Sequence, residues 1–373
     1  MLIIDGDYPM SFGALDLNRD LTRPLSEVRA APPDRFADPT HPDQETMATL
    51  PEMRSAGVAA ALVKAVGRIQ RPGSSLWGFR GPEAAYAAAR GQLEYYRVLE
   101  ARGEGRILRT SQAFSDHMLQ WLQTDDRTTL PVGFVIGLEG ADPILWPEQF
   151  DDWWQAGVRV VSLSHYGVST YCHGTGTGTA GGLFPPAQAL LKRMDSLGAI
   201  LDLTHAADES IRQMLDLYSG PVLASHQNCR ALAPGERQFP DEVLRRMIDR
   251  GGVIGVSIDS RMLYKKGIDW GATAFPPIRD VFPREEVTLE DLANHVDHIC
   301  QLAGDTNHAA IGGDTDGQGG REAAPLGIDS VADFVKLGDV LKARGYTQGD
   351  IENVLNRNWQ RFFEKFLPKF ESK

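Results

Sequence analysis

The chain has 373 residues, with 38 Lys and Arg against 50 Asp and Glu, so its formal net charge is −12. This acidic balance argues against a nucleic-acid-binding protein, because neutralising phosphates requires clustered positive charge. Apolar residues make up 42% and charged residues 24%, which excludes a largely disordered chain. The length would allow two domains, but an α/β barrel of this size often forms one unit, so we predict a single domain over residues 1–373.

The N-terminal segment and the cysteines bear on the compartment. The opening MLIIDGDYPM lacks the basic and apolar regions of a secretory signal, and no window reaches the roughly 18 apolar residues of a membrane span. The three cysteines, Cys172, Cys229 and Cys300, are widely spaced, and none lies in a CxxC motif. An odd, scattered set suits a reducing compartment better than a disulfide framework. We therefore expect a cytoplasmic protein that contacts neither membrane nor nucleic acid.

Short apolar runs alternate with helical segments along nearly the whole chain, which indicates repeated βα units around a parallel sheet. We expect strands at 2–5, 57–65, 132–139, 158–165, 199–205, 221–226, 252–258 and 309–314. Helices are expected at 82–104, 109–123, 147–156, 185–197, 207–218, 240–250, 289–303, 329–344 and 347–366. Eight strands fit a (β/α)8 barrel of the TIM type. The Pro- and Gly-rich segments 66–81 and 259–288 are predicted to be loops over the active face.

Ionisable side chains stand at the ends of several predicted strands. These are Asp5 and Asp7 after the first strand, then Glu139, His165, His205, His226 and Asp314. In a parallel barrel all strands end at one mouth, so these side chains would converge. Each one alone is explained as a hydrogen-bonded loop residue or a helix cap, but the joint pattern favours a metal or catalytic centre. Of the other histidines, we expect structural or surface roles for His295, His298 and His308 and solvent exposure for His41, His117 and His173.

Several segments, in the expected order, resemble the zinc-dependent membrane dipeptidases of peptidase family M19, which are amidohydrolase-type barrels. The matching segments are GLEGAD (137–142), VVSLSH (160–165), LGAILDLTH (197–205), PVLASHQNCR (221–230), GGVIGVSI (251–258) and HAAIGGDTDG (308–317). The resemblance implies that Glu139, His205 and His226 are metal ligands and that Asp314 is the catalytic aspartate. It also implies that His165 contacts the substrate and that Arg230 binds it.

The opening IDGDYPM departs from the family pattern. The family has a His-x-Asp pair of metal ligands here, whereas this chain has Asp7 and Pro9. Proline offers no ligand atom, so the resemblance implies one tightly bound zinc, held by Glu139, His205 and His226. Whether Asp7 holds a weak second cation or orients water stays open.

The function that this resemblance implies is zinc-dependent hydrolysis of a dipeptide or a similar small amide with a free carboxylate. Asp314 would accept the proton of the nucleophilic water, His165 would stabilise the oxyanion, and Arg230 would pair with the substrate carboxylate. Two alternatives remain: a mononuclear amidohydrolase acting on a non-peptide amide or lactone, and a non-catalytic barrel that binds a carboxylate. The resemblance also implies a homodimer.

Overall fold

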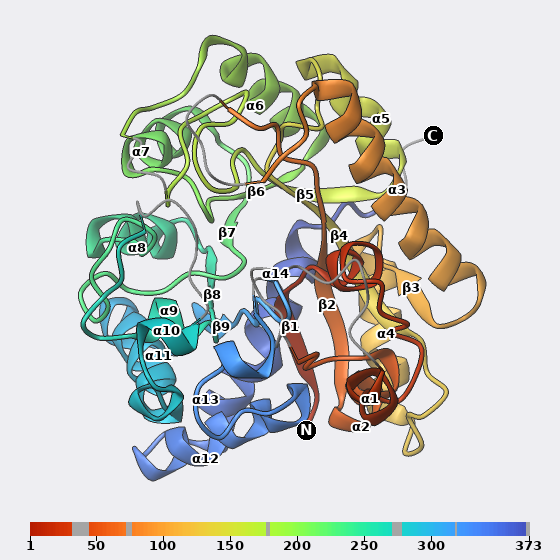
Figure 1. Cartoon of the computed structure of the whole chain (residues 1–373), viewed down its shortest axis with the longest axis vertical. Helices are drawn as coiled ribbons and strands as arrows, with labels where there is room; N and C mark the ends of the chain where they lie inside the picture. The colour runs from red at the N-terminus through yellow and green to blue at the C-terminus, as the bar shows by residue number, and fades with distance from the viewer. Residues whose placement is uncertain (32–44, 72–76, 177–179, 271–277, 318, 371–373) are drawn as a thin grey trace.

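The computed structural model describes residues 1–31, 45–71, 77–176, 180–270, 278–317 and 319–370. The strands form a ring at the centre of the molecule, and helices surround this ring (Figure 1). Within these ranges no helix has the length and apolar character that crossing a membrane requires.

Eight parallel strands follow one another around the ring in chain order. They are β1 (Ile3–Tyr8), β2 (Val58–Val66), β4 (Val132–Glu139), β5 (Val158–Ser162), β6 (Ile200–Asp202), β7 (Val222–Ala224), β8 (Val253–Val256) and β9 (Ala309–Ile311). Each pairs in parallel with the next. This order confirms the predicted (β/α)8 barrel, in which the carboxyl ends of all strands face one mouth.

A ninth strand, β3 (Gly105–Ile107), lies off this order and pairs with the start of β4. The sequence did not predict it, because three residues are too few to show the alternation of apolar and polar positions that marks a strand.

Helices cover the outside of the ring. The longer ones are α3 (Pro82–Ala101), α4 (Ser111–Gln123), α6 (Pro185–Leu197), α7 (Asp208–Leu217), α8 (Asp241–Asp249), α11 (Leu289–Ala303), α12 (Lys336–Ala343) and α14 (Asn358–Phe366). Shorter ones are α1 (Leu25–Ala30), α2 (Leu50–Ala56), α5 (Phe150–Gln155), α9 (Ser260–Leu263), α10 (Ile278–Val281) and α13 (Gln348–Glu352). Single turns of 3-10 helix are η2 (Pro147–Gln149), η3 (Arg284–Glu286), η4 (Arg321–Ala323) and η5 (Val331–Val335), and π-helical turns are η1 (Phe12–Asp16) and η6 (Asn353–Arg357).

Every predicted helix overlaps one or more of these elements, but the loops are less simple than predicted. The segment 259–288, expected to be a loop, contains α9, α10 and η3, while its residues 271–277 lie outside the described ranges. The segment 66–81 has a bridge between Ile69 and Phe79, and its residues 72–76 are likewise not described. Helices as short as α9 carry too little periodicity to be recognised in sequence.

The ring closes between β1 and β9 through a buried aspartate. Asp5 on β1 accepts hydrogen bonds from the backbone N–H of Gly313 at 2.6 Å and from the hydroxyl of Thr315 at 3.1 Å, both just after β9. It also accepts one from the backbone N–H of Asp7 at 3.1 Å. Burial raises the pKa of Asp5 to about 7. Asp5 therefore joins the first and last strands and has a structural role.

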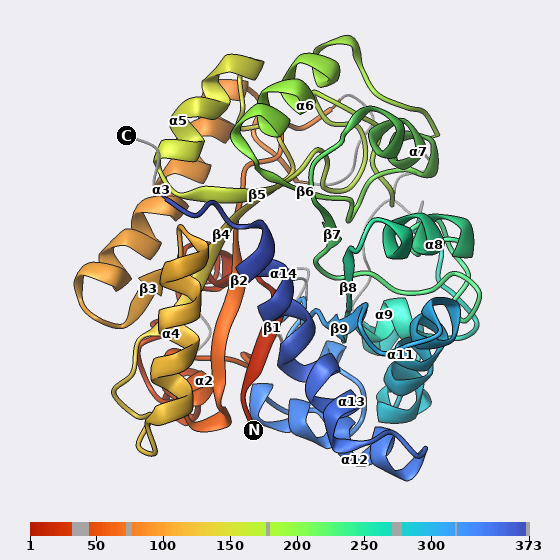
Figure 2. The ribbon, with the colours of Figure 1, turned by 180° about the vertical axis from the view of Figure 1, so that it is seen from behind.

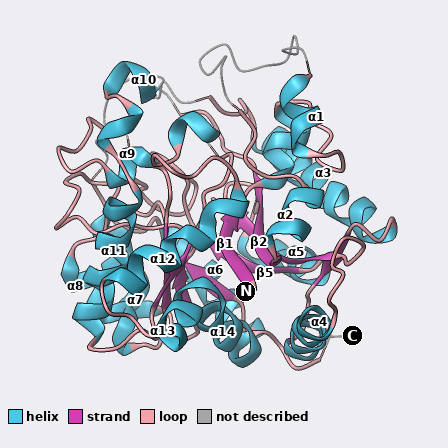
Figure 3. Cartoon of the chain, turned by 90° about the horizontal axis from the view of Figure 1, so that it is seen from below, coloured by secondary structure: helices cyan, strands magenta, loops and turns pink. Residues whose placement is uncertain are grey.

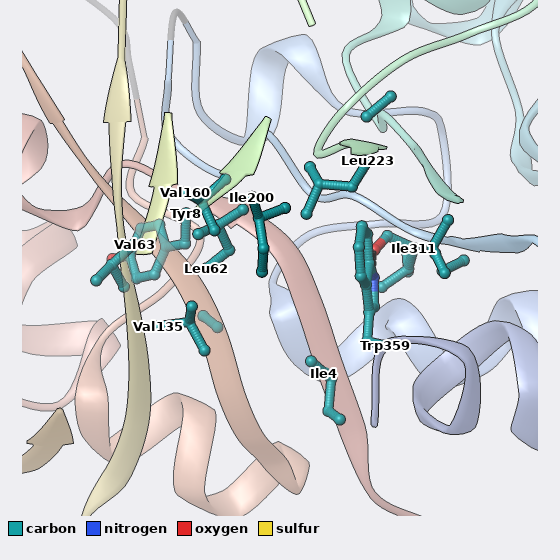
Figure 4. Packing of buried hydrophobic residues seen from close by; sticks show 14 of the residues in the cluster. Ile4, Tyr8, Leu62, Val63, Val135, Val160, Ile200, Leu223, Ile311 and Trp359 are labelled. Atoms are coloured by element: carbon teal, nitrogen blue, oxygen red, sulfur yellow. Dashed lines mark hydrogen bonds between the residues drawn. The ribbon is translucent and has the colours of Figure 1, made fainter. Parts of the chain in front are cut away.

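The amino-terminal end of the barrel is covered by α14, which crosses the ring of strands when the molecule is seen from behind (Figure 2). Its Trp359 is fully buried beside Ile311, whose carbonyl accepts a hydrogen bond from the indole N–H at 2.8 Å (Figure 4). In Figure 3, α14 lies on the same side as the N-terminus, and α9 and α10 lie on the opposite side. A functional site therefore belongs at the other end, where the strands finish.

Two histidines differ from their predicted exposure to solvent. His173 is half-buried, with its ring centroid 4.9 Å from that of Phe184. His117, expected to be exposed to solvent, is fully buried on α4, with Nε2 at 2.8 Å from the carbonyl oxygen of Ala59. Burial lowers the pKa of His117 to about 4, so the ring is neutral. It lies on the apolar face of α4 together with Phe114 and Trp121, and a histidine on such a face packs as a neutral residue. His41 lies outside the described residues.

Candidate metal centre

Three of the predicted metal ligands meet at the carboxyl-terminal mouth of the barrel. Nε2 of His205, which follows β6, lies 3.0 Å from Oε1 of Glu139 at the end of β4. The same nitrogen lies 3.0 Å from Nε2 of His226, which follows β7, and that atom is 3.5 Å from Oε1 of Glu139. Tetrahedral ligands at zinc distances of about 2.0–2.2 Å stand roughly 3.3–3.6 Å apart. The three atoms therefore fit one zinc ion.

The backbone and the surroundings of His205 favour this arrangement. Its φ of 69° is in the left-handed region, which a residue with a side chain adopts only when its surroundings hold it there. Its carbonyl accepts a hydrogen bond from the backbone N–H of Thr175 at 2.8 Å. Burial, with the nearby charge of Arg237, lowers the pKa of His205 well below its ordinary value. The imidazole is therefore neutral, which is the form that binds metal.

Asp7 contacts the opposite side of His226. Its Oδ1 lies 3.2 Å from Nδ1 of His226 and 3.0 Å from Nζ of Lys64 on β2. Burial disfavours a protonated His226, but the carboxylates of Asp7 and Asp314 outweigh that effect and raise the pKa of the ring. A carboxylate that accepts the Nδ1 proton fixes an imidazole for metal binding through Nε2. Asp7 is therefore placed to orient His226.

Lys64 and Asp202 form a charged pair inside the barrel. Nζ of Lys64 lies 2.9 Å from Oδ2 of Asp202 and donates to the hydroxyl of Ser225 at 3.2 Å, and both charged side chains are fully buried. Oδ1 of Asp202 accepts from the backbone N–H of Thr204 and of Ser225. Burial disfavours the Lys64 ammonium, but Asp202 and Asp7 outweigh it and raise the lysine pKa. Burial likewise disfavours the Asp202 carboxylate, but Lys64 outweighs it and lowers the Asp202 pKa to about 2.

His165, which follows β5, lies beside these ligands with its ring centroid 4.4 Å from that of His205. Its Nδ1 is 3.0 Å from a guanidinium nitrogen of Arg68. Burial, with the neighbouring His205, lowers the pKa of His165 well below its ordinary value, so the ring is neutral. Because a guanidinium only donates, Nδ1 must accept, and the ring proton lies on Nε2. His165 is thus a hydrogen-bond donor through Nε2.

Asp314 follows β9 with a left-handed φ of 51°. Its Oδ2 lies 4.0 Å from Nε2 of His226. Burial raises the pKa of Asp314 to about 7, with further contributions from Asp259 and Asp7 that the opposing effect of His226 does not cancel. Beside it a small pocket is lined by Met47, Ile258, Asp259, Asp314, Asp316 and Ala323 among others. A carboxyl group with a pKa near neutrality suits proton transfer.

Ligand atoms fall into two adjacent groups of three, each with its atoms within 4.8 Å of one another. One consists of Glu139, His165 and His205, and the other of Asp7, His226 and Asp314. Among the described residues, the first group thus has His165 where the zinc position described above has His226, and His226 belongs to the second group, around Asp7.

Arg230 lies in the loop after β7 and is paired with an aspartate at the start of α7. Its guanidinium contacts the two carboxylate oxygens of Asp208 at 2.6 and 2.8 Å. It also donates to the carbonyls of Gln238 and Glu236. Both side chains of the ion pair are half-buried, with exposed fractions of 28% and 29%. A substrate carboxylate that binds to Arg230 must therefore share the guanidinium with Asp208 or displace Asp208 from it.

The charged residues of this site that were not predicted include Lys64, Arg68 and Asp202. Lys64 interrupts the otherwise apolar run GVAAALVKA, and Asp202 interrupts AILDLTH. A charge in a strand that is buried on both faces must find a partner, so each interruption was a usable signal. Arg68 lies in a segment with no periodic pattern and carried no such signal.

The comparisons with known proteins concern the chain as a whole. The model of the membrane dipeptidase family, peptidase family M19, matches residues 41–367. An uncharacterized dipeptidase of Schizosaccharomyces pombe is 26% identical over 236 residues, which are 62% of this chain and 53% of that protein. Dipeptidase verJ of Clonostachys rogersoniana is 28% identical over 236 residues, 62% of this chain and 55% of that protein. The chain spans about half the length of the curated relatives it matches.

Two solved structures share the fold over nearly the whole chain. The dipeptidase AC, a metallopeptidase of family M19, superposes with a TM-score of 0.74 at 20% identity, covering 98% of this chain and 99% of that one. A metallopeptidase from Rhodobacter sphaeroides, solved with a phosphinate mimic of the dipeptide L-Ala-D-Ala, gives a TM-score of 0.73 at 20% identity and the same coverage.

Fold and site together define a (β/α)8 barrel with a cluster of His, Glu and Asp side chains, suited to metal binding, at the carboxyl ends of its strands. Because the family model spans most of the chain, the protein belongs to the membrane dipeptidase family, peptidase family M19. This confirms the resemblance that the sequence motifs indicated.

Proposed function

We propose that this protein is a zinc-dependent dipeptidase, a single barrel domain over residues 1–373 that cleaves dipeptides or similar small amides with a free carboxylate. The observation that carries the proposal is the convergence of Oε1 of Glu139 with Nε2 of His205 and Nε2 of His226, all 3.0–3.5 Å apart. One carboxylate and two imidazoles are a donor set of catalytic zinc sites. We propose one tightly bound zinc.

A zinc ion held by Glu139, His205 and His226 would lower the pKa of a bound water and make it a nucleophile. Asp314 accepts a proton from the nucleophilic water and passes it to the leaving amine, and its carboxylate lies for this at the mouth of the barrel, 4.0 Å from Nε2 of His226. His165 donates from Nε2 to the oxygen on which negative charge develops. Arg68 supports this role because its guanidinium keeps the proton of His165 on Nε2.

Arg230 is proposed to bind the terminal carboxylate of the substrate through its planar guanidinium. In the structure Asp208 occupies that guanidinium with two hydrogen bonds. Asp208 therefore competes with the substrate, and the pair sets how strongly the carboxylate is bound. A substrate carboxylate binds more tightly when both of its oxygens contact the guanidinium, as those of Asp208 do.

We also propose that the protein acts in the cytoplasm as a homodimer. The three cysteines are buried and free, which supports a reducing compartment. Sedimentation velocity of the purified chain measures the oligomeric state, and a monomer at micromolar concentration would contradict the dimer.

The deciding experiment combines metal analysis with a substrate panel on the same preparation. The panel contains L,L-dipeptides, non-peptide amides, lactones and L,D-dipeptides, the last because the relative from Rhodobacter sphaeroides was solved with a mimic of L-Ala-D-Ala. We expect dipeptide hydrolysis in proportion to bound zinc. Hydrolysis confined to lactones or non-peptide amides would establish the alternative enzyme, and carboxylate binding without turnover would establish a binding protein.

A further inference from the structure

We propose that the ammonium group of Lys64 is a built-in cation that closes the second group of ligand atoms, Asp7, His226 and Asp314, to a metal ion. The inference rests on the proposed zinc centre for its location. It concerns how many metal ions the barrel holds, and it does not depend on which substrate is cleaved.

The surroundings of Lys64 form a complete site for an ammonium group. Nζ lies 2.9 Å from Oδ2 of Asp202, 3.0 Å from Oδ1 of Asp7 and 3.2 Å from the hydroxyl oxygen of Ser225. Asp202 and Ser225 each accept a hydrogen bond from the ammonium group, and Asp7 adds an ion pair. Lys64, Asp7 and Asp202 are fully buried, so water does not replace any of these partners. The lysine is therefore fixed in place.

The oxygen that Lys64 contacts is the one that a second metal would need. Oδ1 of Asp7 faces both Nζ of Lys64 at 3.0 Å and Nδ1 of His226 at 3.2 Å. A metal bound to this carboxylate would lie about 2.0–2.2 Å from it, next to a fixed positive charge with no water between them. Nδ1 of His226 also lies 3.0 Å from the hydroxyl oxygen of Ser225, so this nitrogen is already in contact with two oxygens. The space beside Oδ1 of Asp7 is therefore occupied, and the charge of this carboxylate is already balanced by Lys64.

The charges inside the barrel also explain why a lysine is retained there. Asp7 and Asp202 bring two buried carboxylates close together, and a buried carboxylate without a counter-charge is strongly unfavourable. Lys64 lies between them and contacts both. If the ammonium is removed, Asp7 loses its counter-charge and favours a divalent cation at the second group of ligand atoms.

The test counts bound metal in the full chain for four proteins: wild type, Lys64→Met, the double variant Asp7→His with Pro9→Asp, and the triple variant that combines all three changes. The double variant restores a His-x-Asp pair, and methionine matches the length of lysine without its charge. After zinc loading and gel filtration, mass spectrometry gives zinc per chain. We expect one ion in the wild type, one in the double variant and two in the triple variant.

In the Lys64→Met variant, zinc added beyond the first equivalent is expected to raise the melting temperature further. In the wild type it should not. Lys266→Met is the matched control, since Lys266 pairs with Glu286 on the surface and should leave one ion. Two ions in the wild type or in the double variant, or one ion in a folded triple variant, would overturn the proposal. If the triple variant fails to fold, Lys64→Met alone decides, and the absence of that rise in melting temperature would overturn the proposal.

The result is separable from the proposed function. A chain that holds one zinc and cleaves no dipeptide would contradict the dipeptidase activity and leave the role of Lys64 standing. A chain that cleaves dipeptides with two zinc ions bound would support the dipeptidase activity and contradict the role of Lys64.

Discussion

Asp7 and His226 face each other across 3.2 Å, with Oδ1 of the carboxylate against Nδ1 of the imidazole. The other ring nitrogen of His226 lies 3.0 Å from Nε2 of His205. The two nitrogens of one ring thus serve different partners. A carboxylate on the outer nitrogen of a metal-binding histidine sets the tautomer, orients the ring and makes it a better ligand. In the proposed zinc centre Asp7 is therefore a positioning residue.

This relationship predicts the effect of Asp7→Asn. The amide keeps the shape of the side chain but loses the charge that holds the proton on Nδ1, so zinc affinity should fall about 10–100-fold. Competition with a chromogenic chelator measures it. Glu27→Gln is the control, because Glu27 pairs with Arg23 on the surface and its loss of charge should leave the zinc affinity unchanged. Unchanged zinc affinity in Asp7→Asn would exclude the orienting role.

His205→Ala and His226→Ala should each abolish tight zinc binding and hydrolysis together. Each removes one of three ligand atoms that lie 3.0–3.5 Å apart, and two ligands do not hold zinc tightly. Metal analysis of the folded variants provides the measurement. His298→Ala is the matched control, since His298 pairs with Asp241 at 2.8 Å and should keep full zinc. Full occupancy in either ligand variant would show that the zinc lies elsewhere.

The location of the candidate site at the mouth of the barrel could be predicted from sequence, because its residues follow the predicted strands. Glu139, His205 and His226 are far apart in the chain, but each follows a short apolar run, and parallel strands in a barrel end on the same side. The predicted strands ran too far, however: 199–205 was expected and Ile200–Asp202 is observed. His205 lies beyond the strand in a left-handed conformation, so the metal-binding geometry depends on irregular backbone that periodicity does not reveal.

That Lys64 pairs with Asp202 could not be predicted from sequence, for a different reason. The two residues are 138 positions apart, and each stands alone in an apolar run. The sequence shows that each needs a partner, but not which partner, because the pairing depends on how far each side chain reaches across the barrel interior. The same holds for the contact between Arg68 and His165, which are 97 positions apart.

The Lys64–Asp202 pair predicts how stability depends on pH. The pKa of Asp202 falls from 3.8 to about 2 in the folded protein, so its contribution is present above about pH 4 and is lost as the pH drops from about 4 to about 2. That contribution is roughly 2 kcal/mol in the free energy of unfolding. Urea unfolding across this range should show the loss in the wild type, and Asp202→Asn should lack it.

At pH 7 the Asp202→Asn variant should be less stable by about 3–5 kcal/mol, because it leaves Lys64 with one charged partner fewer in the interior. Asp216→Asn removes one partner of an ion pair on the surface, with Arg246, and should cost less than about 1 kcal/mol. Equal losses in the two variants would mean that the buried pair contributes no more than a surface contact.

Arg230 and Asp208 give the last prediction, which concerns substrate recognition. If the guanidinium binds the terminal carboxylate, Arg230→Ala should lower kcat/KM for free dipeptides about 10–100-fold more than for their C-terminal amides, the value of a charged hydrogen bond. Asp208→Asn should act in the opposite direction and lower KM for free dipeptides, because the amide competes less strongly for the guanidinium. Arg212→Ala is the control, since Arg212 pairs with Glu242 on the surface and should change neither ratio. Equal losses on dipeptides and amides in Arg230→Ala would show that the Arg230–Asp208 pair only holds the loop after β7 against α7.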